Sequence, residues 1–382
     1  MKKTLLSSLL LTLAFGSFSQ TVIHETRTLS FGGQQRQYRL YVPASYDGSQ
    51  KVPLVFVLHG LGDDMLNMEG VGMTYIADTA NFIVITPQAV ADPLAGTAWN
   101  SGAGTFGYYP NSNVDDVGFF RTLIDSTAAE FKIDQRRVFA CGFSMGGFMT
   151  NRLACQLNDR IAAFAPVAAT IGDGITCTPG RVLPIITFHG TADVTVSYDT
   201  ASFGMSVPDL LTFWANNNGC TAVDTFAMPD INPNDGYTVD HFVWGSCTAG
   251  AALEHFRVYG ATHTWLGPTD DIFYTAEIWK FFLRFEHPDE TLGALGVEIK
   301  TSTSDKYSLA PNPTEKGNSI TLNHPKETVK VSVMDVSGKI VLEQNTVTNA
   351  TTLSTDKLNS GIYFLNFTAT NGSKICRKFV VR

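Results

Sequence analysis

The amino-acid sequence predicts an α/β fold, in which a mostly parallel sheet carries helices on both faces, followed by a small all-β sandwich. Between residues 20 and 290, apolar runs alternate with segments of helical periodicity, as in parallel strands joined by crossover helices. Near residue 290 this pattern gives way to short alternating strands separated by turn residues, which is typical of a sandwich. A chain of 382 residues also exceeds what one core usually supports. We therefore expect two domains.

Continuous apolar runs predict the buried strands of the first domain. They are rich in β-branched residues, as strands covered on both faces are, and they span residues 52–59, 82–86, 137–143 and 184–189. A further strand is expected at residues 253–259. Between the second and third runs we expect a crossover helix, because apolar residues recur there at helical spacing. These residues are Val117, Phe120, Ile124, Ala128 and Phe131.

The first 19 residues predict a secretory signal peptide. Two lysines precede an apolar stretch from Leu5 to Phe18, and small residues stand at Ser17 and Ser19, the positions that a signal peptidase reads. We expect cleavage after Ser19. A membrane anchor is the alternative, but the run is shorter than the ~20 apolar residues that a spanning helix needs. Since no later segment qualifies, we expect no transmembrane segment in the mature protein.

Charge is scarce and unevenly distributed along the chain. Asp, Glu, Lys and Arg make up 16% of the residues, against roughly 25% in an ordinary soluble domain. The net charge of −8 divides into +5 for residues 300–382, from 11 basic and 6 acidic residues, and −13 for residues 1–299, from 16 basic and 29 acidic residues. The acidic part would repel a phosphate backbone, which argues against a nucleic-acid partner. It also favours a neutral substrate over a strongly anionic one.

The segment from 307 to 382 carries four motifs in a consistent order. They are Leu309-Ala-Pro-Asn-Pro313, Val333-Met-Asp-Val-Ser-Gly338, Leu358-Asn-Ser-Gly-Ile-Tyr-Phe364 and Lys378-Phe-Val-Val-Arg382. With them the segment resembles the C-terminal sorting domain of type IX secretion substrates. The resemblance implies contact with the type IX machinery and export across the outer membrane, to the medium or the cell surface. An immunoglobulin-like carbohydrate-binding module is the alternative, and a linker is expected at residues 291–306.

A nucleophile elbow is predicted where the third apolar run ends. The run leads directly into Gly142-Phe-Ser-Met-Gly146, and Gly147 and a helical segment through Gln156 follow. A serine on so sharp a strand-to-helix turn needs small flanking residues. The helix N-terminus behind Ser144 offers its dipole and free N–H groups to a developing oxyanion. A tight turn with a buried serine would give the same string, but the strand before it and the helix after it favour a catalytic Ser144.

An acid and a base are expected later in the chain, in the order Ser, Asp, His. Asp193 follows the run 184–189, and His263 follows the strand expected at 253–259. Both would lie on loops at the carboxyl edge of the sheet, where parallel strands gather their chemistry.

The competing acids and histidines are less well placed. Asp199 and Asp209 lie further from a strand end, and His241 precedes the last strand. His255 lies within that strand, so we expect it to be packed in the core. His59 and His189 each precede a glycine at a strand end, which favours structural support or a place in the oxyanion loop.

Seven short motifs follow one another between residues 35 and 285. They are Tyr38-Arg-Leu-Tyr-Val-Pro43, Leu58-His-Gly-Leu-Gly62, Trp99-Asn100, Asp115-Asp-Val117, Gly142-Phe-Ser-Met-Gly-Gly147, His189-Gly-Thr-Ala-Asp193 and Thr262-His-Thr-Trp265. In this order they resemble the α/β-hydrolase esterases that include feruloyl esterases, acetyl-xylan esterases and polyhydroxybutyrate depolymerases. The resemblance implies the α/β-hydrolase fold, with the nucleophile at Ser144, the acid at Asp193 and the base at His263.

The same resemblance implies an oxyanion hole formed by the backbone N–H groups of Met145 and Leu61. Leu61 stands where the depolymerase branch often has a cysteine, which counts against a polyester substrate. The expected chemistry is ester hydrolysis through an acyl-enzyme, which needs no metal or organic cofactor. Asp115 and Asp116 could suggest a metal site, but an acidic pair that begins a helix is better explained as a cap and a partner of the helix dipole.

Six cysteines in an exported protein permit disulfides. We expect Cys155 to pair with Cys177 and Cys220 with Cys247, because each pair bridges an element to the loop that follows it. Connectivity does not follow from sequence alone, so other pairings stay open. Cys141 lies inside the strand before the elbow and is expected to be a buried free thiol.

Aromatic residues near the predicted catalytic face bear on the substrate. Trp99, Tyr108 and Trp265 lie in loops there, and their faces suit a phenolic acyl group, a sugar ring or a polyester chain. The alternative is that they pack the loops. We expect a secreted carboxylic ester hydrolase acting on polysaccharide esters, feruloyl above acetyl. The alternatives are a polyhydroxybutyrate-type depolymerase, an α/β-hydrolase peptidase and a surface-displayed carbohydrate-binding protein without activity.

Overall fold

The computed structural model describes residues 21–294, 308–312, 314–324, 328–335, 339–345, 350–369 and 374–382. Two compact units divide between Gly296 and Val297. The predicted signal peptide at 1–19 and the predicted linker from 295 to 306 lie outside the described residues. A short helix, α7 (Glu290–Ala294), overlaps the first residues of the predicted linker. Among the helices of the described ranges, none is long and apolar enough to cross a membrane.

A ten-stranded mixed sheet forms the centre of the first unit. Its strands, from one edge to the other, are β1 (Ile23–Phe31), β2 (Gln34–Val42), β4 (Ile83–Pro87), β3 (Val52–Leu58), β7 (Ile133–Phe143), β8 (Ala163–Val167), β9 (Pro184–Gly190), β12 (Ala252–Tyr259), β11 (Thr238–Gly245) and β10 (Ala222–Ala227). The six strands from β4 to β12 run parallel, and antiparallel strands extend the sheet at both edges. The four predicted runs and the further predicted strand are all among these parallel strands.

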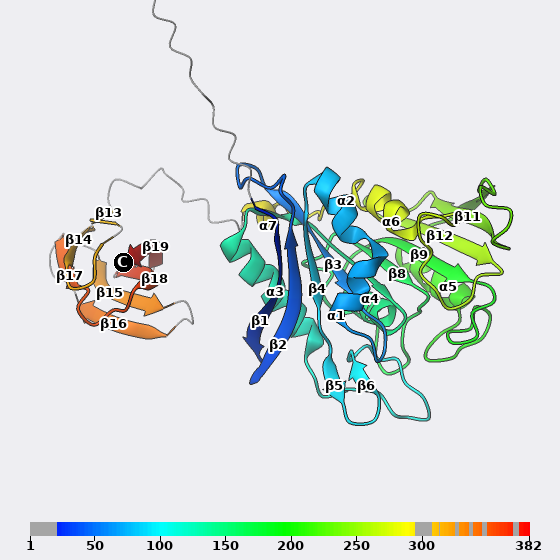
Figure 1. Cartoon of the computed structure of the whole chain (residues 1–382), viewed down its shortest axis with the longest axis horizontal. Coiled ribbons are helices and arrows are strands. Elements are labelled where there is room, and N and C mark those ends of the chain that lie inside the picture. The colour runs from blue at the N-terminus through cyan, green and yellow to red at the C-terminus, as the bar shows by residue number, and fades with distance from the viewer. Residues whose placement is uncertain are drawn as a thin grey trace, which may run out of the picture. The chain divides into compact units, whose positions relative to one another are not determined.

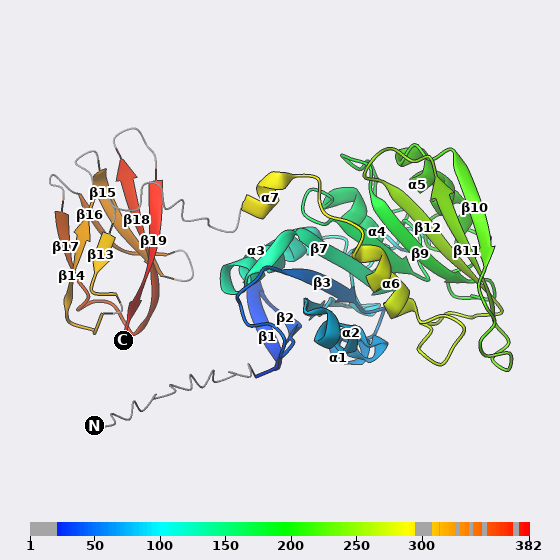
Figure 2. The ribbon, with the colours of Figure 1, turned by 90° about the horizontal axis from the view of Figure 1, so that it is seen from above.

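Helices cover both faces of this sheet (Figures 1 and 2). One face carries α3 (Asp116–Glu130), α4 (Met145–Gln156) and α5 (Val207–Asn217). The other carries α1 (Met65–Met68), α2 (Met73–Ala80) and α6 (Tyr274–Phe282), with a 3-10 turn, η1 (Glu69–Val71), between the first two. The predicted crossover helix is α3, and the α/β fold with helices on both faces is confirmed.

Two apolar layers make up the core of this unit, one on each side of the sheet. On β3, Leu54, Phe56 and Leu58 enter one layer, and Val55 and Val57 enter the other. All of the β3 residues are buried, because side chains of a strand point alternately to its two faces and both faces are covered here. The sequence of a strand in this position is therefore an unbroken run of apolar residues.

A small hairpin and a long loop follow β4. The hairpin consists of β5 (Val90–Asp92) and β6 (Gly96–Ala98), and residues 99–115 lead from it to α3. The Asn111 side chain anchors the loop on the hairpin, because it donates to Val90 O at 2.9 Å and to Ala98 O at 2.7 Å. This loop forms part of the pocket described below.

A buried ion pair joins the same region to the edge of the sheet. Arg36 on β2 and Asp116 at the start of α3 are 3% and 1% exposed, and their side chains approach to 2.7 Å. The carboxylate also accepts from Asn100 N at 2.8 Å. Asp115 caps α3 by accepting from Gly118 N at 2.8 Å. The expected helix cap is therefore present at Asp115, whereas Asp116 serves the ion pair.

Cys141 lies near the centre of the sheet, on β7. Its side chain is fully buried, and Sγ lies 3.4 Å from Phe56 O on the neighbouring strand. Burial raises the pKa of the Cys141 thiol. Within the described residues of the first unit, Cys141 is the free cysteine that the sequence predicts.

The C-terminal unit is a small sandwich of two antiparallel sheets. One sheet has the order β13 (Ser308–Ala310), β14 (Ser319–Asn323) and β17 (Ala350–Ser354), and the other has the order β16 (Ile340–Asn345), β15 (Thr328–Asp335), β18 (Gly361–Ala369) and β19 (Lys374–Val381). Both sheets contribute to one apolar core, with Ile320 and Leu353 from the first and Val331, Leu365 and Phe379 from the second. The predicted all-β sandwich is confirmed.

Candidate active site

Ser144 lies on a strained turn between β7 and α4. Its backbone has φ 53° and ψ −122°, and a residue with a side chain adopts such a conformation at a cost of about 1–3 kcal/mol. A Cβ on Gly142 would lie 2.4 Å from Gly146 O, and a Cβ on Gly146 would lie 2.3 Å from Leu58 O. Neither position has room for a side chain. The glycine spacing around Ser144 is therefore required by the close packing of this turn against β3.

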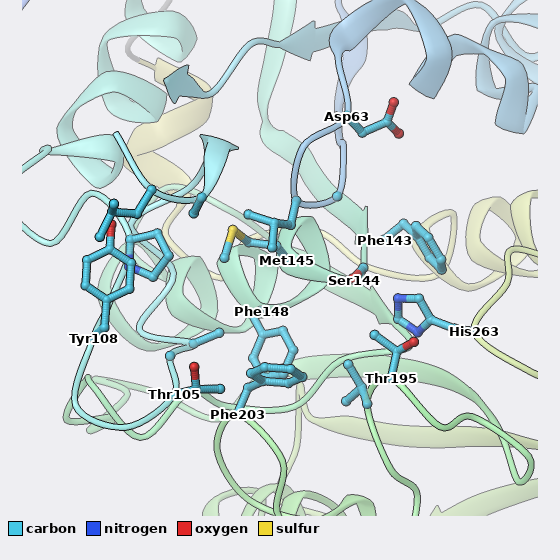
Figure 3. Close-up of a pocket in the computed structure, with 18 residues that line it drawn as sticks. Asp63, Thr105, Tyr108, Phe143, Ser144, Met145, Phe148, Thr195, Phe203 and His263 are labelled. Atoms are coloured by element: carbon cyan, nitrogen blue, oxygen red, sulfur yellow. The ribbon is translucent and has the colours of Figure 1, made fainter. Parts of the chain in front are cut away.

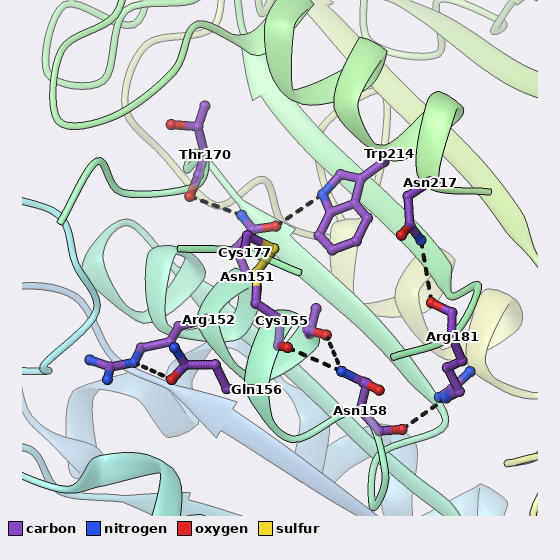
Figure 4. The surroundings of a disulfide bond; sticks show 11 residues. Asn151, Arg152, Cys155, Gln156, Asn158, Thr170, Cys177, Arg181, Trp214 and Asn217 are labelled. Atoms are coloured by element: carbon purple, nitrogen blue, oxygen red, sulfur yellow. Dashed lines mark hydrogen bonds between the residues drawn. A yellow bond between two sulfur atoms is a disulfide. The ribbon is translucent and has the colours of Figure 1, made fainter. Parts of the chain in front are cut away.

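The helix behind Ser144 is anchored along its length (Figure 4). Near its middle, Asn151 donates to Thr170 O at 3.0 Å and accepts from the Trp214 indole at 3.3 Å. Near its end, Cys155 forms a disulfide with Cys177. These contacts tie α4 to α5 and to the segment that follows β8, so the N-terminus that carries Ser144 has a fixed position. The second predicted pair, Cys220 with Cys247, is also present as a disulfide.

Asp193 and His263 form a hydrogen-bonded pair at the carboxyl edge of the sheet. Asp193 follows β9 and His263 follows β12, and Asp193 Oδ2 lies 2.7 Å from His263 Nδ1. The other oxygen accepts from the backbone N–H groups of Thr195 and Val196, each at 2.9 Å.

These contacts determine the protonation of the pair. Burial alone would raise the pKa of Asp193, but hydrogen bonds from His189, His263 and Val196 outweigh it and hold the pKa well below its usual range. An ionised carboxylate can only accept a hydrogen bond, so Nδ1 of His263 carries the proton. Nε2 is then the basic nitrogen of this imidazole.

Ser144 and His263 line the same pocket, and Figure 3 shows their side chains next to one another. The Phe143 ring lies against the His263 imidazole, with ring centroids 4.8 Å apart. This contact restricts rotation of the imidazole and keeps it beside the serine.

The loop after β3 approaches Ser144 from the other side. A Cβ on Gly60 would lie 3.4 Å from Ser144 Cβ, and Leu61 lines the pocket. Met145 is the first residue of α4, and an N–H group in the first turn of a helix has no partner within that helix. Leu61 and Met145, the two residues predicted to form the oxyanion hole, thus both line the pocket that contains Ser144.

His59 holds this loop in place. Its imidazole is fully buried, with Nε2 accepting from Ala89 N at 3.0 Å and Nδ1 donating to Gly60 O at 2.7 Å. Its carbonyl accepts from the Trp99 indole at 3.0 Å. Burial lowers the pKa of His59, so the ring stays neutral, as these two hydrogen bonds require. His59 is therefore a structural support of the loop.

The pocket beside Ser144 has a volume of about 540 Å³ and a mostly apolar wall. Phe148 and Phe203 meet edge to face on one side, with ring centroids 6.3 Å apart. Tyr108 lies at the end away from His263 (Figure 3), and its hydroxyl donates to Asp92. That hydrogen bond, together with those from the backbone N–H groups of Asn111, Leu94 and Ala95, lowers the pKa of Asp92 to about 2. The tyrosine ring is thus held in the wall by an ionised carboxylate.

Two of the three aromatic residues predicted to contact substrate do not line this pocket. Trp99 is completely buried and packs on Phe120, while its indole donates to His59 O. The prediction for Trp99 is wrong, because this loop tryptophan turns into the core. Trp265 lies two residues beyond His263 but lines a second hollow. Tyr108 lines the pocket with Ser144.

The remaining histidine candidates are held by structural contacts. His255 is fully buried between the hydroxyl groups of Thr187 and Tyr198, at 2.8 and 2.9 Å, and burial lowers its pKa to about 3. His189 Nε2 lies 2.8 Å from Val196 O. In the ranges that the structure describes, no group of three or more His, Cys, Asp or Glu side chains could hold a metal ion.

Several pocket residues are not among those predicted from the sequence. Phe148 follows Ser144 by four residues on α4, about one helical turn, so its spacing could have revealed it. Phe203 and Leu94 line the pocket from irregular segments far away in the sequence. No periodic signal marks them, because their position depends on how those segments fold back.

Comparison with known proteins identifies two matching families. Residues 45–224 match the family Phospholipase/Carboxylesterase. Residues 308–382 match the Secretion system C-terminal sorting domain.

Similar curated proteins are named as esterases. Feruloyl esterase B of Piromyces equi is 33% identical over 234 residues, which cover 58% of this chain and 41% of that protein. A bifunctional acetylxylan esterase/xylanase of Neocallimastix patriciarum is 26% identical over 234 residues, which cover 61% of this chain and 31% of that protein. Feruloyl esterase C of Emericella nidulans is 30% identical over 228 residues, which cover 56% of this chain and 76% of that protein. The chain thus spans less than half the length of the first two relatives.

Proposed function

The chain belongs to the α/β-hydrolase carboxylesterases that include the feruloyl esterases, and we propose that it is a secreted serine hydrolase that cleaves esters carried by polysaccharides. The observation that carries the proposal is that Ser144 and His263 line one pocket while Asp193 is hydrogen-bonded to His263. The serine lies on a strained turn, and the histidine is hydrogen-bonded to an ionised carboxylate. This is the arrangement that activates a hydroxyl as a nucleophile.

In the first half-reaction, Nε2 of His263 takes the proton of Ser144 as the hydroxyl attacks the ester carbonyl. Asp193 stabilises the resulting imidazolium through the 2.7 Å bond to Nδ1. The N–H groups of Met145 and Leu61 receive the oxyanion, and each such donor is typically worth about 3 kcal/mol of transition-state stabilisation. The imidazolium then protonates the leaving alcohol, and the acyl group remains on Ser144.

The second half-reaction releases the acid by the same route. His263 takes a proton from water, whose oxygen attacks the acyl carbonyl, and the same two N–H groups receive the second oxyanion. The imidazolium returns its proton to the Ser144 oxygen as the acyl bond breaks. One ester and one water thus yield one acid and one alcohol, and the enzyme returns to its starting state.

The shape of the pocket favours an aromatic acyl group. Phe148, Phe203 and Tyr108 present ring faces and edges to a space of about 540 Å³, and aromatic rings pack well in offset or edge-to-face arrangements. An acetyl group would leave most of that space unfilled. We therefore expect feruloyl esters to be better substrates than acetyl esters, and the net charge of −13 on residues 1–299 favours neutral ones.

A polyester depolymerase with the same three residues is the second candidate. Large apolar side chains are exposed on or beside the pocket lining, namely Leu61 at 50%, Leu94 at 80%, Phe106 at 108% and Val194 at 92%. Apolar side chains gathered in this way suit contact with an apolar polymer surface. This observation distinguishes the candidate from a peptidase or an inactive binding protein, which no feature of the pocket favours.

The C-terminal unit supports the proposed site of action. Residues 308–382 match a family of sorting domains, and we propose that they direct export through the type IX machinery to the medium or the cell surface. The predicted signal peptide would supply the earlier step. Under this proposal the hydrolase unit meets its polymeric substrate outside the cell.

Hydrolysis of p-nitrophenyl butyrate tests the mechanism. Ser144→Ala is expected to lower kcat by about 10⁵–10⁶-fold, because the nucleophile is lost. Ser45→Ala, at an exposed serine outside the pocket, is the matched control and should keep the wild-type rate. Wild-type activity in Ser144→Ala would exclude an acyl-enzyme at this residue.

Parallel assays on methyl ferulate, acetylated xylan and polyhydroxybutyrate test the substrate class. The proposal predicts the highest kcat/KM on methyl ferulate. The highest activity on polyhydroxybutyrate would instead support the second candidate, and hydrolysis of none of the esters would favour a binding protein.

A further inference from the structure

A second hollow, of about 460 Å³, lies between the helices after β3 and the segment after His263. Its lining comes from residues 67–75, on α1, η1 and α2, and from residues 265–273. Three of its nine described lining residues are aromatic, namely Tyr75, Trp265 and Phe273, and none of the nine carries a charged side chain. Tyr75 is 70% exposed. The hollow therefore presents open aromatic surface in an uncharged setting.

The wall of this hollow is fixed in advance by a chain of hydrogen bonds. The Trp265 indole donates to Thr275 Oγ1 at 3.0 Å, and the Thr275 hydroxyl donates to Val71 O at 2.6 Å. Thr275 is fully buried, whereas Trp265 and Val71 both line the hollow. The two sides of the hollow are thus joined through a buried hydroxyl group. A ligand would meet a tryptophan that is already oriented, so little conformational freedom is lost on binding.

The hollow adjoins the pocket that contains Ser144. Asp63 lines the pocket, Asn67 lines the hollow, and the Asn67 amide donates to Asp63 Oδ1 at 2.9 Å. On the other side, Trp265 lies two residues beyond His263 in the same segment. Figure 3 shows Asp63 and His263 on the side of the pocket away from Tyr108. The linings of the two spaces are therefore connected on the His263 side of Ser144, by the Asn67–Asp63 hydrogen bond and by the segment from His263 to Trp265.

The chemistry of ester cleavage places the leaving alcohol on this same side. His263 must reach the alcohol oxygen with Nε2 in order to protonate it, within a hydrogen-bond distance of about 3 Å. The acyl group then extends the other way, between Phe148 and Tyr108. A long alcohol component leaves the pocket past His263 and Asp63, toward Asn67 and Trp265.

We propose that the hollow is a subsite for the neutral sugar chain that carries the ester, with pyranose rings lying on Tyr75 and Trp265. This inference rests on the proposed function, because it assigns the alcohol component of the same reaction. Sugar rings present apolar C–H faces that pack on aromatic rings, and their hydroxyl groups can hydrogen-bond to a side-chain amide such as that of Asn67. The uncharged lining and the rigid tryptophan suit such a chain.

Binding of xylohexaose to the full-length protein, measured by titration calorimetry, tests the subsite without ester hydrolysis. We expect saturable binding that Tyr75→Ala weakens by about fivefold. Trp265→Phe should also weaken binding, because its ring would lack the hydrogen bond to Thr275. Phe226→Ala, at a 54% exposed aromatic residue on β10, is the matched control and should bind as the wild type does.

Kinetics give a second measurement on the same variants. The ratio of kcat/KM for feruloylated xylo-oligosaccharide to kcat/KM for methyl ferulate should fall about fivefold in Tyr75→Ala and stay at the wild-type value in Phe226→Ala. An unchanged ratio together with unchanged xylohexaose binding would overturn the inference. So would binding of decanoate, and not xylohexaose, that Tyr75→Ala weakens, because the hollow would then be an apolar-chain site.

The two proposals fail in different ways. If the wild type hydrolyses methyl ferulate but does not bind xylohexaose, the subsite is excluded and the proposed function stands. If xylohexaose binds and Tyr75→Ala weakens it while no ester is hydrolysed, the sugar site stands and the proposed function is excluded.

Discussion

The charge state of Asp193 decides which nitrogen of His263 carries the proton. Its carboxylate accepts from Nδ1 at 2.7 Å, and backbone N–H groups of Thr195 and Val196 hold the opposite oxygen. An amide at this position could donate as well as accept, so it would no longer specify the tautomer of the imidazole. The tautomer of His263 is thus set by the ionisation of Asp193.

Asp193→Asn is therefore expected to lower kcat for p-nitrophenyl butyrate by about 10³–10⁴-fold with little change in KM. Asp199→Asn makes the same change at an exposed carboxylate six residues further along and should keep the wild-type rate. Steady-state kinetics of both variants check this. A loss of less than about tenfold in Asp193→Asn would show that another group orients His263.

His255 should make the fold sensitive to mild acid. Its pKa is lowered to about 3 by burial, whereas an unfolded histidine titrates near 6.5. Between about pH 3 and pH 6.5, His255 binds a proton in the unfolded chain but not in the native state. The free energy of unfolding therefore falls as the pH falls below about 6.5. From about pH 7 to pH 5, His255 alone should cost about 2 kcal/mol of unfolding free energy.

Urea unfolding of the wild type and of His255→Gln, at about pH 7, 6 and 5, measures this contribution. The variant should be less stable at pH 7 but should lose less stability on acidification. Part of the pH dependence should remain, because burial also lowers the pKa values of His59 and His287. Equal slopes for the two proteins would show that His255 does not cause the effect.

Individual residues can be predicted from sequence where a backbone constraint accompanies them. The place of Ser144 follows from glycines that have no room for a Cβ, and those of Asp193 and His263 follow from the ends of buried strands. Trp99 has no such constraint. The orientation of its side chain depends on a hydrogen bond to His59 O, 40 residues earlier in the chain. No local sequence pattern predicts that contact.

At the scale of elements, two neighbouring acidic residues at the start of α3 have different structural roles. Asp115 caps the helix at the surface, and Asp116 is buried against Arg36. A lost cap exposes one N–H group to water, whereas a lost carboxylate at Asp116 leaves a buried guanidinium unpaired. The second loss is the larger one.

Asp116→Ala is expected to lower the free energy of unfolding by about 3–5 kcal/mol, and Asp115→Ala by about 1 kcal/mol. Chemical denaturation of both variants checks this difference in unfolding free energy. The m value, the slope of that free energy against denaturant concentration, should be fitted for each variant separately. Similar losses in the two variants would show that the buried pair contributes no more than a helix cap.

Elements are predictable from sequence where both faces of a strand are buried. Strands β3, β4 and β9 and the second half of β7 have sequences that are mainly apolar for this reason. The strand β8 was not predicted, because it has only five residues and one of them is Pro166. The edge strand β10 is exposed along its whole length, and so it carries no apolar signal. The helix α7 has five residues, too short for a periodic pattern.

At the scale of the whole molecule, two units with separate cores carry separate tasks. The first has its own two-layered core and holds the pocket, and the second has a sandwich core of its own. The excess of acidic residues lies in the first and the excess of basic residues in the second. The length of the chain and the change of sequence pattern near residue 290 predict this division.

Removal of residues 297–382 should therefore leave kcat/KM for p-nitrophenyl butyrate within about twofold of the full-length value. In the native host the shortened protein should stay inside the cell envelope, because the sorting unit is missing. Activity in the medium and in cell fractions measures both effects. Loss of activity on feruloylated xylan alone would instead identify the C-terminal unit as a carbohydrate-binding module.

The buried Cys141 thiol has a consequence for oxidative folding. Cys141 precedes Cys155, Cys177, Cys220 and Cys247 in the chain, and these four form the two disulfides of the hydrolase unit. In an unfolded chain its thiolate would compete for each of these partners by thiol–disulfide exchange. Once β7 is enclosed between β3 and β8, burial removes that competitor. The order in which sheet assembly and oxidation occur therefore decides between native pairing and a scrambled, trapped chain.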